Sequence, residues 1–334
     1  MAVSAADDAP RRSLRLGFAG TPVFAVAALD ALTQSQHRIV GVFTKADRAT
    51  GRGQKLQASP VKARALELGL SVHQPATFKD AAACAALEEL RLDALIVVAY
   101  GLILPERALN APRLGCFNIH ASLLPRWRGA APIQRAILAG DRTSGVSIMR
   151  MERTLDTGPV LAARSVDIGP LDTGGSLHDR LAVLGGELVR ETMDELAAGR
   201  ATAIAQPAQG VTYAEKISKA EALIDWHEDA DQIARKVRAF MPAPIGETRL
   251  NGEQLRIWEA HALPESAAGA GAAVGTGARA VAPPGTVLSA TSDGIEVMCG
   301  RGILCIGRLQ QAGRKAVSAA EFIRAHRLGG AIFA

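Results

Sequence analysis

The chain has 334 residues, of which 48% are apolar, and this is enough for one large domain or two ordinary domains with their own cores. No apolar run reaches the roughly 18–20 residues of a membrane-spanning helix, so we expect no membrane association. The net charge of +5 is compatible with a polyanionic partner such as a nucleic acid, although many basic proteins bind none.

The N-terminal stretch and the cysteines indicate the compartment. Residues 1–13 lack the order of a signal peptide, and we predict a disordered tail there. The four cysteines, Cys84, Cys116, Cys299 and Cys305, are scattered and have no spacing typical of a metal site. Scattered cysteines are typical of a reducing compartment, which predicts a cytoplasmic protein without disulfides.

From residue 14 the chain alternates strands and helices. An apolar strand is predicted over residues 14–20, a helix opened by Thr21-Pro22 follows it, and a second strand covers residues 39–44. This order predicts a mostly parallel, Rossmann-like sheet, and therefore an α/β fold class. The first turn reads Gly17-x-x-Gly20 instead of the dinucleotide fingerprint, so the fold does not imply a nicotinamide cofactor.

A polar and basic segment occupies residues 45–58, and we predict a long loop there, mobile because of its glycines and charges. Gly51-Arg52-Gly53 lies at its centre, and Ser59-Pro60 predicts the start of the next helix. The spacing of Gly and Lys is not that of a phosphate-binding loop. Two interpretations stay open, a solvated basic loop and a loop that contacts nucleic acid.

An apolar loop follows the strand predicted over residues 93–99. It runs from Tyr100 to Pro105 and has no obvious solvent-facing side. Apolar loops at strand ends can form a wall for a flat heterocycle, or they can simply pack into the core. The residues leave both interpretations open.

Asn118 and His120 end the next apolar run, which begins at Gly115. Period-two geometry puts both side chains on one face of a strand, and open α/β sheets bind ligands beyond the carboxyl ends of their strands. Asp156 lies in a Gly- and Pro-rich turn after the following strand. An amide can donate to a developing oxyanion, an imidazole can relay a proton, and a carboxylate can orient the imidazole.

The residues offer no obvious covalent nucleophile. Ser122 lies in a turn without the Gly-x-Ser-x-Gly elbow. This favours direct attack of an amine or of water on a bound carbonyl group. The spacing does not identify the compound that carries the carbonyl.

We predict that the first domain ends at residue 206. Residues 145–151 and 160–165 are expected to form an antiparallel strand pair, and a long amphipathic helix should end near residue 198. The polar residues 207–212 are predicted to be a linker.

The second domain is predicted over residues 213–334. A helix over residues 230–240 is followed by short strands whose spacing is typical of a small barrel. Residues 262–284 are rich in Ala, Gly and Pro, which indicates a low-complexity insertion between two strands. A short final helix is expected over residues 318–326.

These motifs resemble the folate-dependent formyltransferases. The core of the resemblance is Asn118-Ile119-His120, then Ser122-Leu123-Leu124-Pro125, and Leu155-Asp156-Thr157-Gly158 downstream. Further stretches are similar to the branch of the family that formylates methionyl-tRNA, namely residues 18–22, 51–53, 98–105, 125–134 and 212–216. The resemblance covers residues 14–325. It implies a catalytic domain over residues 14–206 and, over residues 213–334, an OB-like barrel that helps to hold tRNA.

The resemblance also implies the reaction. The formyl donor would be 10-formyltetrahydrofolate, and the acceptor would be the α-amino group of methionine on initiator tRNA. Asn118, His120 and Asp156 match the catalytic residues of the family, and no metal is required.

Two sets of binding residues follow from the same resemblance. The folate would contact one turn and one loop, formed by Ser122, Leu123, Leu124 and Pro125 and by Tyr100, Gly101, Leu102 and Ile103. The acceptor end of the tRNA would contact the basic loop, through Arg48, Arg52 and Lys55.

Several alternatives stay open at this point. Other formyltransferases act on an amine of a sugar nucleotide or a purine precursor, and a hydrolase would use water as the acceptor. A non-catalytic tRNA-binding protein would need the basic loop and the barrel, but it has no use for Asn118, His120 and Asp156. We expect a monomer, because no self-complementary apolar stripe is evident.

Overall fold

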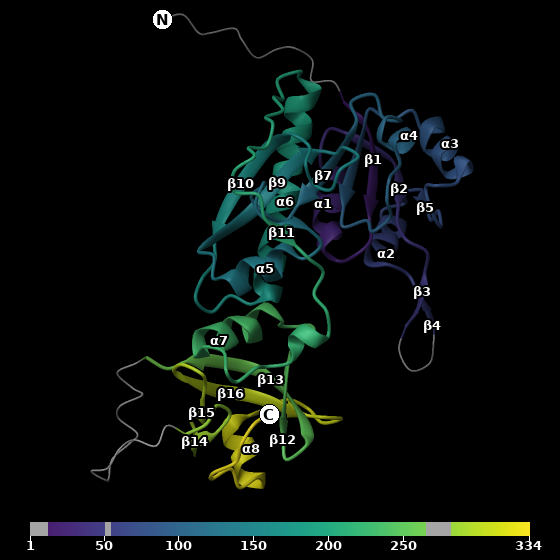
Figure 1. Cartoon of the computed structure of the whole chain (residues 1–334). Coiled ribbons are helices and arrows are strands. Elements are labelled where there is room, and N and C mark those ends of the chain that lie inside the picture. Colours follow the sequence, from purple (N-terminus) through teal and green to yellow (C-terminus); the bar gives the residue numbers. More distant parts are fainter. Residues whose placement is uncertain (1–12, 51–54, 265–281) are drawn as a thin grey trace, which may run out of the picture. The chain divides into compact units, whose positions relative to one another are not determined.

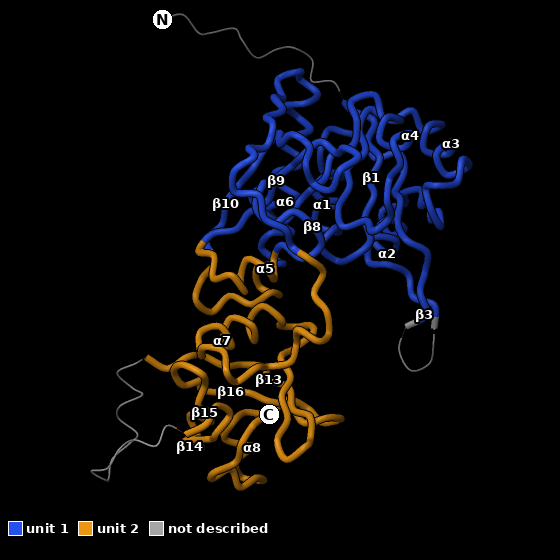
Figure 2. The backbone as a smooth tube through the Cα atoms, in the orientation of Figure 1, with its two compact units in different colours: residues 1–132, 143–167, 178–214 blue, residues 133–142, 168–177, 215–334 orange. Residues whose placement is uncertain are grey.

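The computed structural model describes residues 13–50, 55–264 and 282–334. The predicted tail over residues 1–13 lies almost entirely outside the described residues, as do Arg52 and most of the insertion at 262–284. The chain forms two compact units (Figure 2). Unit 1 contains residues 1–132, 143–167 and 178–214, and unit 2 contains residues 133–142, 168–177 and 215–334.

Unit 1 is built on a seven-stranded sheet with the strand order β10-β9-β7-β6-β1-β2-β5 (Figure 1). Its strands are β1 (Arg15–Gly20), β2 (Arg38–Phe43), β5 (Val72–His73), β6 (Ala94–Val98), β7 (Cys116–His120), β9 (Thr143–Arg150) and β10 (Val160–Asp167). In this order, the neighbouring strands β7, β6, β1, β2 and β5 are parallel, whereas β9 pairs antiparallel with β7 and β10 pairs antiparallel with β9. The predicted mostly parallel sheet and the antiparallel pair are confirmed.

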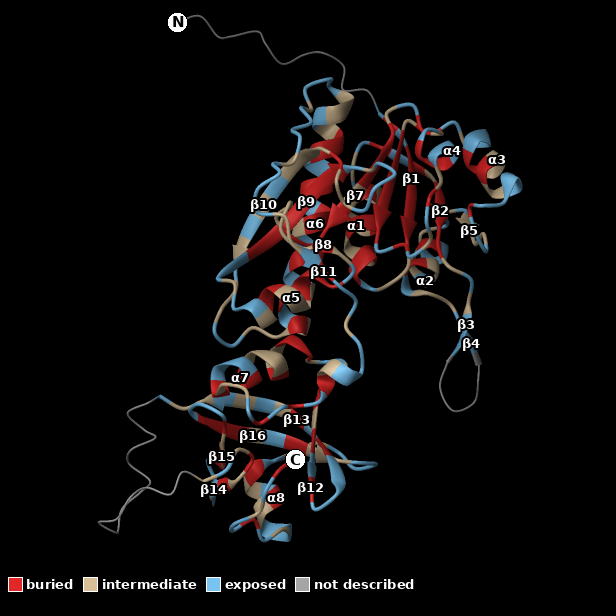
Figure 3. Cartoon of the chain, in the orientation of Figure 1, coloured by how far each residue is buried: buried red, intermediate tan, exposed pale blue. Residues whose placement is uncertain are grey.

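The central strands are apolar runs because they are buried. All five residues of β6 are buried, as expected for a parallel strand inside an α/β sheet. Strand β1 is likewise buried except at its first residue (Figure 3). The helices that lie wholly or mostly in unit 1 are α1 (Phe24–Thr33), α2 (Pro60–Glu67), α3 (Ala81–Glu89), α4 (Glu106–Leu109) and α6 (Gly174–Ala197). Ser59 caps α2 as predicted, since its hydroxyl accepts from the Lys62 N–H and Pro60 is the first helical residue.

Two local predictions in unit 1 are wrong. Helix α1 begins at Phe24, and Thr21 does not cap it, because the Thr21 hydroxyl donates to the Tyr100 carbonyl at 2.9 Å and ties the exits of β1 and β6 together. The segment over 45–58 is not only a loop, since β3 (Arg48–Thr50) and β4 (Lys55–Gln57) form an antiparallel hairpin. The base of the hairpin is fixed at Asp47, whose carboxylate accepts hydrogen bonds from Lys62 and Gln74.

Unit 2 holds a separate antiparallel sheet with the order β12-β13-β16-β15-β14, and β17 pairs with β16. The strands are β12 (Gly246–Leu250), β13 (Glu253–Ala262), β14 (Val287–Thr291), β15 (Gly294–Met298), β16 (Ile303–Gln311) and β17 (Val317–Ser318). The helices are α5 (Pro132–Ala139, mostly in this unit), α7 (Ala230–Ala239) and α8 (Ala319–Ala325), with a 3-10 turn over Ala220–Ala222. Phe333 bridges to Leu250 of β12 and Ile332 bridges to Thr286 beside β14, so the end of the chain contacts both edges of the sheet.

Trp226 lies in the core of unit 2. It is 3% exposed, stacks on Phe333 and donates its indole N–H to the Thr248 hydroxyl at 2.9 Å. The four cysteines of the chain are buried and unpaired. Among the described residues, no helix has the length and apolar character that a membrane span requires.

Candidate active site

Strand β7 carries Asn118 and His120 to the carboxyl edge of the parallel sheet. In the register, Asn118 lies opposite Val97 of β6 and Met149 of β9, and His120 lies opposite Ser147 of β9. Neighbouring strands therefore hold Asn118 from two sides and His120 from one, and the alternation of the backbone puts their side chains on one face. Asn118 is partly exposed, and its amide makes no hydrogen bond within the described part of the chain. The amide is thus available to a ligand.

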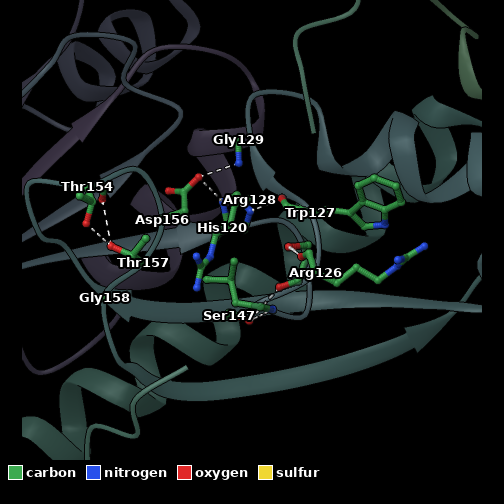
Figure 4. A network of polar contacts seen from close by, with 12 residues as sticks. His120, Arg126, Trp127, Arg128, Gly129, Ser147, Thr154, Asp156, Thr157 and Gly158 are labelled. Atoms are coloured by element: carbon green, nitrogen blue, oxygen red, sulfur yellow. Dashed lines mark hydrogen bonds and ion pairs between the residues drawn. The ribbon is translucent and has the colours of Figure 1, made fainter. Parts of the chain in front are cut away.

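His120 is held between a carbonyl and a carboxylate (Figure 4). Its Nε2 lies 2.8 Å from the carbonyl oxygen of Trp127, and its Nδ1 lies 3.7 Å from Oδ2 of Asp156. A carbonyl only accepts, so Nε2 carries a hydrogen and donates it. Nδ1 is then the ring atom that gains or loses a proton, and it does so next to the Asp156 carboxylate.

Asp156 lies in a turn with a left-handed backbone, with φ of 52°. Asp tolerates this region better than most residues do. Its Oδ2 accepts the N–H of Gly129 at 2.8 Å, and its own carbonyl accepts from the side-chain amide of Gln206 at 2.8 Å. The carboxylate is therefore fixed both by its side chain and by its backbone.

The turn over residues 122–125 is fixed by hydroxyl groups. Ser122 is 1% exposed and donates its hydroxyl to the Arg126 carbonyl at 2.7 Å. The Ser147 hydroxyl donates to the Ser122 carbonyl and accepts the N–H of Leu124, which ties the turn to β9. Ser122 thus shapes the turn, and the partly buried Leu123, Leu124 and Pro125 form its accessible surface.

The loop after β6 lies partly in the core and partly at the surface. Tyr100 is 2% exposed and packs edge-on against Phe78, and burial raises the pKa of its phenol. The core interpretation is therefore correct for the Tyr100 ring. Ile103 is 84% exposed, Leu102 is half-buried and Gly101 is exposed with φ of 77°, so these three residues present the apolar surface of the loop.

A cavity of about 580 Å³ lies where β1, β2 and β6 end. Its lining includes Lys45 and Arg48, and within the described residues neither side chain forms a hydrogen bond or ion pair. The neighbouring Asp47 is bound by Lys62 at 2.6 Å, and hydrogen bonds from Lys62 and Gln74 lower the pKa of its carboxyl. Two cationic side chains that line the cavity are therefore available to an anionic ligand. Arg52 and the side chain of Lys55, the other predicted tRNA contacts, lie outside the described part.

Comparison with known proteins identifies the family. A family model described as "Formyl transferase" matches residues 14–193, and one described as "Formyl transferase, C-terminal domain" matches residues 216–327. A methionyl-tRNA formyltransferase of Methylococcus capsulatus is 51% identical over 317 residues, which are 95% of this chain and 98% of that protein. The chain belongs to the methionyl-tRNA formyltransferase family.

Solved structures with the formyltransferase fold are more distant in sequence. HypX from Aquifex aeolicus, solved in complex with tetrahydrofolic acid, aligns with a TM-score of 0.62 at 17% identity, over 93% of this chain and 47% of that chain. An N-formyltransferase from Helicobacter canadensis, solved with folinic acid and dTDP-3-aminofucose, aligns with a TM-score of 0.60 at 17% identity, over 89% of this chain and 99% of that chain. At this identity the likeness shows the fold alone.

In this member of the methionyl-tRNA formyltransferase family, the sequence did not predict the groups that surround His120 and Asp156. These are the Trp127 carbonyl, the Gly129 N–H, and the side chains of Arg128, Gln206 and Thr212. Backbone groups carry no signal in the sequence. Gln206 and Thr212 lie in a polar segment that has the composition of a linker, so no local pattern distinguishes them. The described residues contain no group of three or more His, Cys, Asp or Glu side chains that could hold a metal.

Proposed function

We propose that the protein transfers the formyl group of 10-formyltetrahydrofolate to the α-amino group of methionine on initiator tRNA. The observation that carries this proposal is the placement of Asn118, His120 and Asp156 at one sheet edge, in a chain that is 51% identical to a methionyl-tRNA formyltransferase. The product is formylmethionyl-tRNA for translation initiation. Because the product is used in translation, we also propose a cytoplasmic protein, and the monomer stays a prediction from the sequence.

The residues of the site support direct transfer between the two substrates. When bound, the folate supplies an electrophilic formyl carbon. The free amide of Asn118 can donate to the formyl oxygen as negative charge develops on it. A bond forms between the amine nitrogen and the formyl carbon, the bond from that carbon to N10 of the folate breaks, and the amine loses one proton while N10 gains one. Nδ1 of His120, beside Asp156, is placed to take and return such a proton.

Two surfaces of unit 1 support the assignment of the substrates. We propose that the folate packs on the apolar surface of Leu102 and Ile103 and on the turn over residues 122–125, with Tyr100 and Ser122 shaping these walls instead of touching the ligand through their side chains. We propose that the anionic acceptor end of the tRNA enters the cavity beside Lys45 and Arg48. The predicted contacts of Arg52 and Lys55 belong to the same hairpin.

For unit 2 we propose an OB-like barrel that helps to hold the tRNA. The antiparallel strand order supports it, as do the bridges from the end of the chain to both edges of the sheet. The domain boundaries at residues 206 and 213 stay a prediction from the sequence, and by its contacts unit 1 extends to residue 214.

The test is formyl transfer from 10-formyltetrahydrofolate to three acceptors: methionyl initiator tRNA, methionyl elongator tRNA and free methionine. We expect product with the initiator tRNA only. Transfer to a sugar-nucleotide amine with none to the initiator tRNA would replace the acceptor in this proposal. Tight tRNA binding without formylation by the intact protein would favour the non-catalytic alternative.

A further inference from the structure

Residues 206–214, most of which the sequence predicts to be a linker, contact the active site at both ends of the segment. The segment ends unit 1 (Figure 2). Its first residue contacts the turn that carries Asp156, and its last three residues contact the backbone beside His120. A plain linker would need neither set of contacts.

Gln206 uses its whole amide group at the Asp156 turn. Its Nε2 donates to the carbonyl oxygens of Asp156 and Gly158, both at 2.8 Å. Its Oε1 accepts from Nε and Nη2 of Arg128 at 3.0 and 2.7 Å. A primary amide supplies two donors and an acceptor on one planar group, whereas a carboxylate of the same shape would face two carbonyl oxygens without a hydrogen.

Arg128 depends on this contact in turn. It is 8% exposed, and its guanidinium forms no ion pair with a carboxylate in the described chain. Removal of the amide would leave a buried cation and two carbonyl groups without these hydrogen-bond partners, and unpaired buried polar groups lower the free energy of unfolding. Gln206 therefore links Arg128, in the strand beside His120, to the turn that holds Asp156.

Thr212 acts on the other side of the pair. Its hydroxyl accepts the Trp127 N–H at 2.8 Å and its carbonyl accepts the Arg128 N–H at 2.9 Å. The next two residues form β11 (Tyr213–Ala214), which pairs in parallel with β8 (Arg128–Gly129). Trp127 has φ of 64°, a conformation that a bulky residue rarely adopts unless its surroundings hold it. This conformation presents the Trp127 carbonyl to Nε2 of His120.

We propose that the segment over residues 206–214 is a positioning element of the active site. In it, Gln206 fixes the position of Asp156, and Thr212 fixes the position of His120. The inference rests on the proposed function for its activity assay. It adds two positioning residues to the catalytic residues, and both act through the protein groups that hold His120 and Asp156.

The experiment compares Gln206→Glu and Thr212→Val with Gln209→Glu, an exposed position in the same segment, and with Thr212→Ser, which keeps the hydroxyl. We expect kcat for formylation to fall about 10²-fold in Gln206→Glu and Thr212→Val, because a displacement of about 1 Å in a catalytic geometry costs that much. KM for both substrates should stay within about threefold, and the pH dependence of kcat should shift, because the surroundings of Nδ1 change. Gln209→Glu and Thr212→Ser should behave like the parent protein.

A second readout does not depend on the acceptor. Imidazole resonances of His120, recorded by NMR with labelled histidine, should change their titration in Gln206→Glu and Thr212→Val and not in the two controls. If the parent protein formylates no tRNA but the titration changes, the proposed function fails and the positioning role stands. Folded variants with parental kcat, pH profile and titration would overturn the inference. A loss of activity that accompanies unfolding in Gln206→Glu, with Thr212→Val folded and fully active, would also overturn it.

Discussion

At the scale of single residues, Asn118 differs from His120 and Asp156 because its side-chain amide has no hydrogen-bond partner in the described chain, whereas the side chains of His120 and Asp156 are held by neighbouring groups. Polar groups in an active site are either held by the protein or kept available for the ligand. The held groups fix geometry, and the free amide is the donor that can strengthen its hydrogen bond as charge develops on a substrate oxygen.

The substitution Asn118→Ala tests that role. We expect kcat for formylation to fall about 10²–10³-fold, the usual cost of a lost oxyanion donor, with little change in the KM for tRNA. Steady-state kinetics would measure this. Asn110→Ala, at the exposed end of α4, is the matched control and should be neutral. An Asn118→Ala enzyme with a raised KM and an unchanged kcat would assign the residue to binding instead.

At the scale of elements, the turn over residues 155–159 is held tightly against β9. A Cβ atom added at Gly158 would lie 1.9 Å from the Arg150 carbonyl oxygen, so any side chain there must displace the turn. The Arg150 N–H also donates to the Pro159 carbonyl at 2.9 Å. Asp156 is part of this turn, and its carboxylate moves if the turn moves.

We therefore expect Gly158→Ala to lower kcat at least about tenfold while the protein stays folded, because the change displaces a surface turn and not a core strand. Kinetics together with a thermal unfolding curve would check this. Gly169→Ala is the control, since an added Cβ atom there meets only the carboxyl group of Asp172, with Oδ2 at 3.4 Å, and the backbone φ is not positive. Parental activity in Gly158→Ala would show that the turn can shift without cost to the site.

At the scale of the whole molecule, the net positive charge is less informative for nucleic-acid binding than the positions of the unpaired cations. Several cations of unit 1 are paired with carboxylates, as Arg107 is with Glu88 at 2.7 Å. Lys45 and Arg48 are not paired within the described residues, and they line a cavity at the sheet edge. Such cations contribute to the salt-dependent part of nucleic-acid binding.

The substitution Arg48→Ala should weaken binding of initiator tRNA and make the plot of log K against log salt concentration shallower by about 1, the value for one lost phosphate contact. A filter-binding or fluorescence titration at several salt concentrations would measure it. Arg107→Ala removes the same charge from the net total but takes it from an ion pair, so it should leave the slope unchanged. Equal slopes for Arg48→Ala and the parent protein would remove Arg48 from the tRNA interface.

The sequence by itself determined the parallel sheet, because buried central strands such as β6 must be apolar runs and the order of elements fixes their direction. It also placed Asn118 and His120 together, since the two-residue period of a strand leaves no other arrangement. It could not show that Tyr100 points into the core, or that Thr21 bonds to Tyr100 instead of capping α1, because these depend on which elements pack together.

Only the tertiary structure decided how His120 and Asp156 are held. The partners of this pair are a carbonyl of Trp127, an N–H of Gly129 and an amide from Gln206, which is 50 residues after Asp156. Backbone groups are the same in every residue, and a glutamine in a polar stretch looks like any other. Which of them surround a site is therefore set by the fold, and the residues that carry the chemistry are the part that the sequence could predict.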